Sequence, residues 1–246
     1  MSHSEMNRRK VVTTAVGATA LATITTAGLA PTPAFAVPVA LKDDGRKEAL
    51  RKLEARRRRI LTGRNSANGW EMENVVDDGG SIWTQPIAGT GLSLAVRAGD
   101  VATVLVHAVR RFHYQVNELG VRGEEPAVRG WVHPSNARDS QLPESNQASG
   151  TAVVIRPSWY MAGMQDAFSP HEVLAIHDIA ADCEGIVRWG GDDRRPHPGL
   201  FYLNVRPGDA KLAHVANKIR SWNETPGQGA GVLRDPTLRR HARHVQ

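Results

Sequence analysis

An apolar repeat at helical spacing runs through residues 101–119 and restricts the fold more than any other feature of the sequence. Its apolar side chains recur three or four positions apart over about five turns, and Asp100 stands where a helix N-cap is expected. They are Val101, Val104, Leu105, Ala108, Phe112, Val116 and Leu119. Such a stripe must be buried against other elements, so we predict a core helix here. His107 and His113 lie on or near this helix, where a lone histidine usually has a structural role.

Two further helices and several short strands follow from patterns of the same kind. Ser169, Pro170 and Glu172 form the signature of a helix start, with a capping box and a proline at the first helical position, and Asp209 caps a last helix. Short apolar runs at residues 128–132, 149–156, 186–189 and 200–205 predict strands, whereas residues 82–96 fit either short strands or an extended loop. The sequence therefore predicts an α+β fold in which a small, mostly antiparallel sheet packs against helices.

The first 36 residues have the three parts of an export signal. Arg8 and Arg9 form a paired-arginine start, residues 11–29 are apolar but rich in Ala, Thr and Gly, and residues 34–36 read Ala-Phe-Ala, a small-x-small cleavage site. We therefore predict a twin-arginine signal peptide that is cleaved before Val37, and a mature protein that is secreted or held in the cell wall. The alternative is a transmembrane anchor, but the Thr and Gly content makes this stretch weakly hydrophobic. We expect no stable membrane span after cleavage.

The chain is basic, with 31 Lys and Arg against 25 Asp and Glu and a formal net charge of +6. The excess lies in residues 51–64, which include four consecutive arginines at 56–59, and in the tail at 234–244. Basic segments attract polyanions, and outside a cell the most available partner is an anionic cell-wall polymer. We expect no specific nucleic acid. Each segment also fits a plainer interpretation, a solvated helix face or a disordered tail.

Cys183 is the single cysteine of the chain. It has no partner, so an intrachain disulfide is excluded and the exported fold must be held by packing or by a bound ligand. Because Cys183 continues the apolar face of the helix that starts after Ser169, we interpret it as a buried, structural thiol.

Two segments together resemble the motifs of one enzyme family. Residues 145–155 read SNQASGTAVVI, and residues 187–192 read VRWGGD and are followed by GLFYL at 199–203. The chain resembles the zinc D-alanyl-D-alanine carboxypeptidases, a family that includes L-alanyl-D-glutamate endolysins and shares a fold with Hedgehog signalling domains. The family's first motif is Ser-x-His-x-x-Gly-x-Ala-x-Asp, and its second is Trp-Gly-Gly followed by an acid, two residues and His-Phe. The resemblance covers residues 69–222 and implies this fold and a peptidoglycan ligand.

The sequence departs from the family at the positions that hold the metal. The resemblance implies that the zinc-binding His and Asp of the first motif correspond to Gln147 and Val154, and that the His of the second corresponds to Leu200. The family's catalytic carboxylate corresponds to His197. Catalytic zinc needs about three ligands from His, Asp, Glu or Cys, and the side chains of valine and leucine have no lone pair to donate. We therefore predict no bound zinc or other cofactor, and no catalytic residue can be assigned.

Polar and aromatic side chains near the substituted positions are the candidates for a binding groove. They are Ser145, Gln147, Ser149, Thr151 and Arg156 in the first segment, and Trp189, Asp192 and Tyr202 in the second, with Trp131 as a further wall. A domain that kept the cleft and lost the metal would bind stem peptides of peptidoglycan without cleaving them. In the other interpretation, Val154 and Leu200 contact each other and extend the core.

Three functions are therefore open. The first is a secreted, catalytically inert peptidase-like protein that binds cell-wall material. The second is an active zinc D,D-carboxypeptidase or endopeptidase with a metal site rebuilt from His133, Asp192, Asp193 and His197, and the third is an extracellular polyanion-binding protein. In all three the predicted organisation is a leader at 1–36, a basic helical segment at 37–68, the carboxypeptidase-like domain at 69–223 and a disordered basic tail at 224–246.

Overall fold

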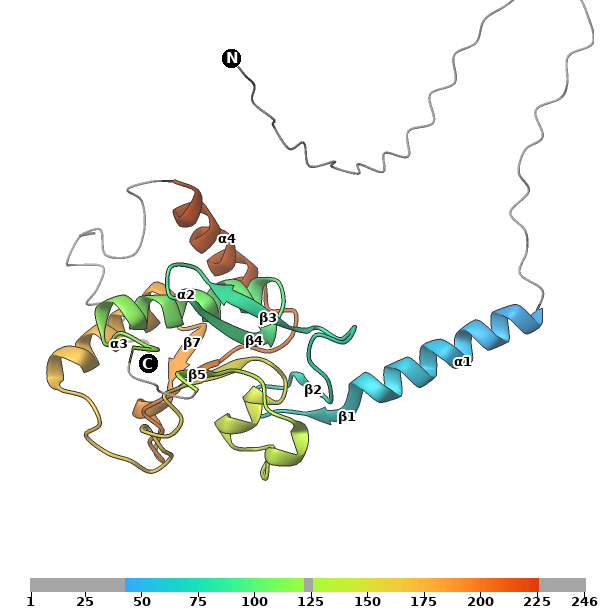
Figure 1. Cartoon of the computed structure of the whole chain (residues 1–246), viewed down its shortest axis with the longest axis horizontal. Coiled ribbons are helices and arrows are strands. Elements are labelled where there is room, and N and C mark those ends of the chain that lie inside the picture. The colour runs from blue at the N-terminus through green and yellow to red at the C-terminus, as the bar shows by residue number, and fades with distance from the viewer. Residues whose placement is uncertain (1–42, 122–125, 226–246) are drawn as a thin grey trace, which may run out of the picture. The chain divides into compact units, whose positions relative to one another are not determined.

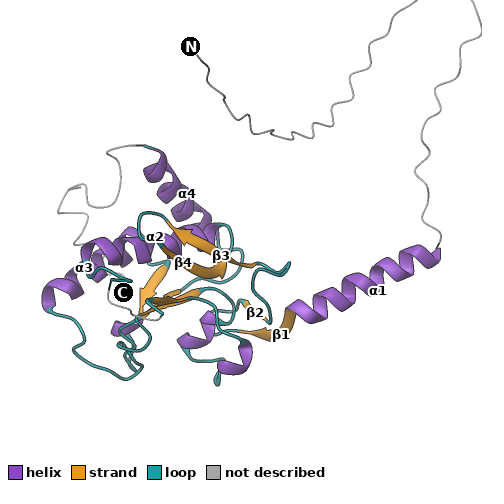
Figure 2. Ribbon diagram, viewed as in Figure 1, coloured by secondary structure: helices purple, strands orange, loops and turns teal. Residues whose placement is uncertain are grey.

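A computed structural model of the chain describes residues 43–121 and 126–225, which all fall in one compact unit (Figure 1, Figure 2). The predicted leader, its cleavage site and the tail from residue 226 onward lie outside the described residues. The described part combines helices with small antiparallel sheets, so the predicted α+β class is confirmed. No described helix combines the length and the apolar character that a bilayer span requires.

The described elements follow one another with short connections. The helices are α1 (Asp43–Ile60), α2 (Asp100–Gln115), α3 (Pro170–Asp182) and α4 (Ala210–Glu224), and three 3-10 turns are η1 (Pro134–Asn136), η2 (Pro143–Gln147) and η3 (Gly190–Asp192). The strands are β1 (Leu61–Asn65), β2 (Glu71–Glu73), β3 (Ile82–Ile87), β4 (Leu92–Arg97), β5 (Val128–Arg129), β6 (Ala152–Ile155), β7 (Val187–Trp189) and β8 (Leu200–Leu203).

The main sheet has the strand order β5-β6-β8-β7, and each neighbouring pair is antiparallel. Successive residues of a strand point to opposite faces, and in β6 and β8 both faces are buried. Val153, Ile155, Phe201 and Leu203 belong to the main core, whereas Ala152, Val154, Leu200 and Tyr202 form a smaller cluster on the other face. This double burial explains why the two strands are apolar throughout rather than alternating.

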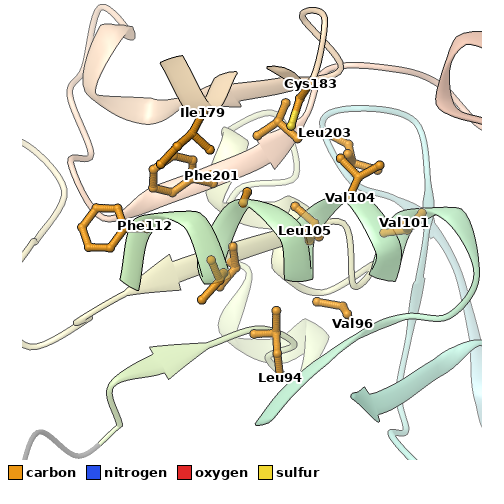
Figure 3. Close-up of a cluster of buried hydrophobic side chains, with 14 of the residues drawn as sticks. Leu94, Val96, Val101, Val104, Leu105, Phe112, Ile179, Cys183, Phe201 and Leu203 are labelled. Atoms are coloured by element: carbon orange, nitrogen blue, oxygen red, sulfur yellow. The ribbon is translucent and has the colours of Figure 1, made fainter. Parts of the chain in front are cut away.

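α2 is the central helix of the main core, as its apolar repeat predicted. It packs against α3, α4, β3 and β4, and Figure 3 shows its buried side chains between those of β4 on one side and those of α3 and β8 on the other. The Phe112 ring meets the rings of Phe168 and Phe201 edge-on, with centroids 5.9 and 6.0 Å apart. Such pairs add to the free energy gained from burial alone.

α2 is shorter than the repeat predicted, and Asp100 is not its cap. The helix begins at Asp100 itself, with Gly99 in the N-cap position, and ends at Gln115. Beyond it the chain bends, and the amide of Leu119 donates to His113 Nδ1 at 3.0 Å. Leu119 is buried after this bend, so the apolar repeat runs past the end of the helix.

The other predicted helix starts are confirmed. The Ser169 hydroxyl accepts a hydrogen bond from the amide of Glu172, and the Glu172 carboxylate accepts one from the amide of Ser169, which is a complete capping box. Asp209 caps α4 by accepting from the amide of Lys211 at 2.9 Å. Cys183 ends α3 and is fully buried; burial raises the pKa of its thiol to about 12.

The β-structure before α2 consists of two hairpins. The segment at 82–96, which the sequence left open, is the antiparallel pair β3–β4. The pair β1–β2 was not predicted, because Gly63 and Asn65 in β1 are poor strand formers. The basic helical segment expected at 37–68 contains α1, whose residues 44–59 are exposed.

Candidate functional site

The polar side chains of the first motif are buried and bond within the domain. Ser149 and Thr151 share a hydrogen bond of 2.8 Å, and Ser66 donates to Ser149 at 2.8 Å. Gln147 Nε2 donates to the carbonyl of Gly130 at 2.9 Å. We expected these side chains to line a groove, but their exposed fractions of 0–7% mean that they do not face solvent. Hydrogen bonds made inside the fold explain why these positions are polar.

Residues 66–68, which precede β2, complete this hydrogen-bond network. Asn68 Nδ2 donates to Thr151 Oγ1 at 2.9 Å and to the carbonyl of Leu203 at 3.0 Å. The amide of Ala67 donates to Ser145 Oγ at 3.0 Å, and Ser145 is buried as well. Residues 66–68 were predicted to belong to the N-terminal segment, whereas these bonds attach them to η2 and the main sheet.

Arg156 is also buried, and its groups are used inside the fold. Its Nη2 donates to the carbonyl of Glu118 at 2.7 Å and to Asn117 Oδ1 at 3.2 Å. The guanidinium carbon lies 4.9 Å from the ring centroid of Trp159, a cation–π contact. Arg156 therefore ties the end of β6 to the turn after α2 rather than facing a groove.

Val154 and Leu200, which the resemblance aligns with two metal ligands of the family, meet on one face of the main sheet. Val154 and Leu200 are register partners in the β6–β8 pair, and both belong to the smaller buried cluster with exposed fractions of 4% and 1%. η2, which contains Gln147, packs on β6 and β8. Of the two interpretations that the sequence left open, the apolar filling of this position by Val154 and Leu200 is the one that the structure contains.

His197 lies beside this cluster. Its backbone amide donates to the carbonyl of Gly190 at 2.8 Å, and its own carbonyl accepts from the amide of Leu200 at 2.9 Å, which directs the chain into β8. The ring is nine-tenths buried, and its Nδ1 bonds to no described residue. Burial lowers the pKa of His197, and the charge of Glu144 on η2 opposes this shift, so the ring is neutral at neutral pH.

The residues of the expected alternative metal site do not form a ligand set. Asp192 pairs with His177 at 3.0 Å, and Asp193 accepts from Tyr202 at 2.9 Å and pairs with Arg188 at 3.0 Å. His133 Nδ1 lies 2.8 Å from the hydroxyl of Ser135. Within residues 43–121 and 126–225, no group of three or more His, Cys, Asp or Glu side chains has the geometry to hold a metal ion. The side chains that the resemblance aligns with the family's ligands do not fit zinc either, since Val154 and Leu200 are hydrocarbon and the neutral carboxamide of Gln147 is a poor zinc ligand.

The glycines of the Trp-Gly-Gly segment have a packing role. A Cβ atom on Gly191 would lie 2.2 Å from the Trp189 ring, and one on Gly190 would lie 2.9 Å from the carbonyl of His197 and 3.0 Å from Leu200 Cβ. Trp189 Nε1 donates to the carbonyl of Pro198 at 2.6 Å. The turn therefore folds tightly over the indole, which only glycine permits.

A pocket of about 260 Å³ lies against this turn. Two loops form it, one before α3 and one between β7 and β8, and apolar side chains dominate its lining. The lining residues are Met164, Gln165, Asp166, Ala167, Phe168, Val173, Trp189, Gly191, Pro196 and Pro198. The His177–Asp192 pair adjoins it, since the His177 ring packs edge-on against Trp189 with centroids 5.6 Å apart. Its size suits one or two small groups of a larger ligand.

Of the aromatic and polar residues predicted for a groove, only Trp189 lines this pocket, and Asp192 flanks it. Tyr202 is buried and bonded to Asp193, and burial raises the pKa of its hydroxyl above the usual range. Trp131 Nε1 instead donates to the carbonyl of Glu73 at 3.0 Å. The pocket residues 164–168 were not predicted. The signal for them is the series of large apolar side chains that starts before them, in a segment without helical or strand periodicity: Trp159, Tyr160, Met161, Met164 and Phe168.

Comparison with known proteins assigns the chain to no group. No protein-family description, no curated protein and no solved structure matches it. The fold and the site therefore define an α+β domain with a small, mostly apolar pocket beside a Trp-Gly-Gly turn, and its function has to be argued from these residues.

Proposed function

We propose that this chain is a secreted, catalytically inert relative of the zinc D-alanyl-D-alanine carboxypeptidases that binds stem peptides of peptidoglycan. The meeting of Val154 and Leu200 across the β6–β8 pair supports the loss of catalysis. Because these side chains fill the position of the family's cleft, binding is assigned to the pocket beside Trp189 instead. The spacing of the motif aligns Val154 and Leu200 with two metal ligands of the family, and the tertiary structure brings them into contact. A scaffold that keeps the positions and replaces their ligands by hydrocarbon fits loss of catalysis within a Hedgehog-type fold.

The pocket beside Trp189 supports binding as the remaining role. The D-alanyl-D-alanine end of a stem peptide carries only methyl side chains, and a volume of about 260 Å³ accommodates one or two such groups. Its lining combines apolar side chains with the carboxylate of Asp166 and the amide of Gln165, a combination that gives both affinity and orientation. The predicted twin-arginine leader would bring the protein to the compartment that contains this ligand.

The first experiment measures zinc. The purified chain is incubated with zinc, desalted and analysed for metal. We expect far less than one zinc per chain, because the side chains at the family's positions donate no suitable electron pairs. Stoichiometric zinc that is lost in the His197→Ala variant would instead favour an active enzyme with a rebuilt metal site.

The second experiment measures retention on purified peptidoglycan. Met164→Glu places a carboxylate in the apolar pocket, and we expect retention to fall about 10-fold because the charge must then be desolvated by the ligand. Met161→Glu is the matched control, since Met161 lies in the same loop, is 57% exposed and does not line the pocket. If both variants are retained like the original chain, the pocket is not the binding site; if the original chain is retained no better than a basic control protein, the proposal fails.

A further inference from the structure

α1 is a long basic helix that projects its charged side chains into solvent. It carries eight basic and four acidic residues, and three of the basic residues lie in its last turn. Every described side chain from residue 44 to residue 59 is exposed. A helix with this composition has no apolar face to bury, so its charges are available for a partner.

The C-terminal end of α1 is attached to the rest of the domain. Ile60 is buried, and its carbonyl accepts from the amide of Asn74 at 2.7 Å. Arg59 pairs with Asp78 at 2.7 Å, and the Arg56 guanidinium lies against Gly79. These contacts involve only residues 56–60, and the basic side chains at residues 46–52 make no ion pair or side-chain hydrogen bond with the rest of the described domain.

The basic side chains are distributed around the helix rather than along one face. At about 100° per residue, Lys47, Arg51 and Arg58 fall within about 40° of one another. Arg46 and Arg57 lie on a different side, next to Leu50 and Leu53. Within the described part of the chain, none of these five basic side chains takes part in an ion pair or a side-chain hydrogen bond, whereas Lys52 pairs with Glu48.

This distribution selects among anionic partners. A membrane surface is flat and would engage one face of α1, and the two exposed leucines, Leu50 and Leu53, provide little apolar area for insertion. Single-stranded nucleic acid is usually held by aromatic side chains that stack on its bases, and α1 contains no aromatic residue. A flexible chain of phosphate groups without bases can follow the charges around the helix. Six of the eight basic residues are arginines, whose guanidinium groups bind phosphate oxygens in pairs.

We infer that α1 binds a flexible polyol phosphate polymer, in which phosphodiester groups link units that carry no bases. This interaction surface is separate from the pocket beside Trp189 and does not depend on the proposed peptide binding. Arg51 and its neighbours supply the attraction, and the exposed leucines contribute little. Affinity is expected to depend steeply on salt, because binding releases counterions from the polymer.

The test uses the purified chain and a glycerol phosphate polymer, with the dissociation constant measured at several salt concentrations. The variant Lys47→Gln/Arg51→Gln/Arg58→Gln removes one cluster of charge, and glutamine preserves helix propensity. We expect the dissociation constant at about 50 mM salt to rise at least 10-fold and the salt slope to fall by about 2 to 3. The control Arg138→Gln/Arg206→Gln/Lys211→Gln removes the same charge from exposed positions elsewhere and should change both values much less.

Three outcomes would overturn the inference. One is equal weakening by the two triple variants, which would mean that only net charge matters. Another is tighter binding to single-stranded DNA at the same phosphate concentration, and the third is tighter binding to vesicles of anionic lipid. Circular dichroism of each variant checks that the total helix content is unchanged. The Met164→Glu variant should bind the polymer normally, which separates this inference from the proposed peptide binding.

Discussion

Glu73 shows at the scale of a single residue how the first hairpin is attached to the domain. Its side chain is fully buried, pairs with Arg97 at 3.1 Å, and accepts from the amide of Ser81 at 2.7 Å. Arg97 in turn donates to the carbonyl of Ser149 at 3.1 Å. A buried carboxylate is costly to desolvate, so its partners are essential to the fold.

Glu73→Ala is expected to lower the free energy of unfolding by about 3–5 kcal/mol, because it leaves the Arg97 charge without its buried partner. Urea denaturation followed by tryptophan fluorescence measures this change. Asp78→Ala, which removes the exposed pair with Arg59, is the control and should cost less than about 1 kcal/mol. Similar losses in the two variants would contradict the structural role given to Glu73.

His107 is the second residue whose substitution we expect to change stability, in this case its dependence on pH. It is buried on α2 near Trp222 of α4, and neither ring nitrogen bonds to a described residue. Burial lowers the pKa of His107 to about 3, and the charges of Arg111, Arg110 and Lys218 act in the same direction. The folded protein therefore holds this ring neutral, whereas the unfolded chain binds a proton near pH 6.5.

The sign of the pH dependence follows from that difference. Below pH 6.5 the unfolded state takes up a proton that the folded state refuses, so stability falls progressively toward pH 3. His107→Leu should flatten the loss of stability between pH 6.5 and pH 4, as measured by thermal unfolding at a series of pH values. His214→Gln changes a histidine whose side chain is 72% exposed and should leave the profile unchanged. An unaltered profile in His107→Leu would mean that His107 is not the group that titrates.

At the scale of elements, some elements are determined by local sequence signals and others by tertiary contacts. The start of α3 is determined within four residues, since Ser169 and Glu172 satisfy each other's backbone amides. β1 and β2 lack such signals, and their pairing depends on residues 66–68, which bond to η2 and the main sheet. This explains why the capped helices were predicted and the first hairpin was not.

Ser169→Ala is expected to cost about 1 kcal/mol of stability, because the amide of Glu172 loses its capping acceptor. Chemical denaturation gives the value. Ser158→Ala, at an exposed loop position, should stay within about 0.5 kcal/mol of the original chain. A loss at Ser169 no larger than that at Ser158 would show that the capping box does not contribute to the stability of α3.

At the scale of the whole molecule, the contact between η2, β6 and β8 allows a direct test of the motif alignment. The triple variant Gln147→His/Val154→Asp/Leu200→His restores the three ligand types of the family. If the positions converge as the family's do, the variant should bind about one zinc per chain, as measured by metal analysis and by an increase in melting temperature with added zinc.

Val154→Asp alone serves as the control for that test. It introduces a buried carboxylate without a partner, so it should bind no zinc and lose several kcal/mol of stability. A folded triple variant that binds no zinc would mean that the register of the motif is wrong. If the triple variant does not fold, zinc-dependent refolding of the same chain distinguishes a destabilised site from a missing one.

By itself, the sequence determined the α+β class, the central helix, and the capped starts of α3 and α4. These properties depend on local periodicity and on caps that span a few residues, both of which can be read along the chain. Only the tertiary structure decided that Val154 and Leu200 meet across two strands, that the polar residues of the first motif are buried in internal hydrogen bonds, and that the pocket lies between loops before α3 and after β7. These outcomes depend on which distant segments pack together, because burial is a property of the assembled fold and not of any one segment.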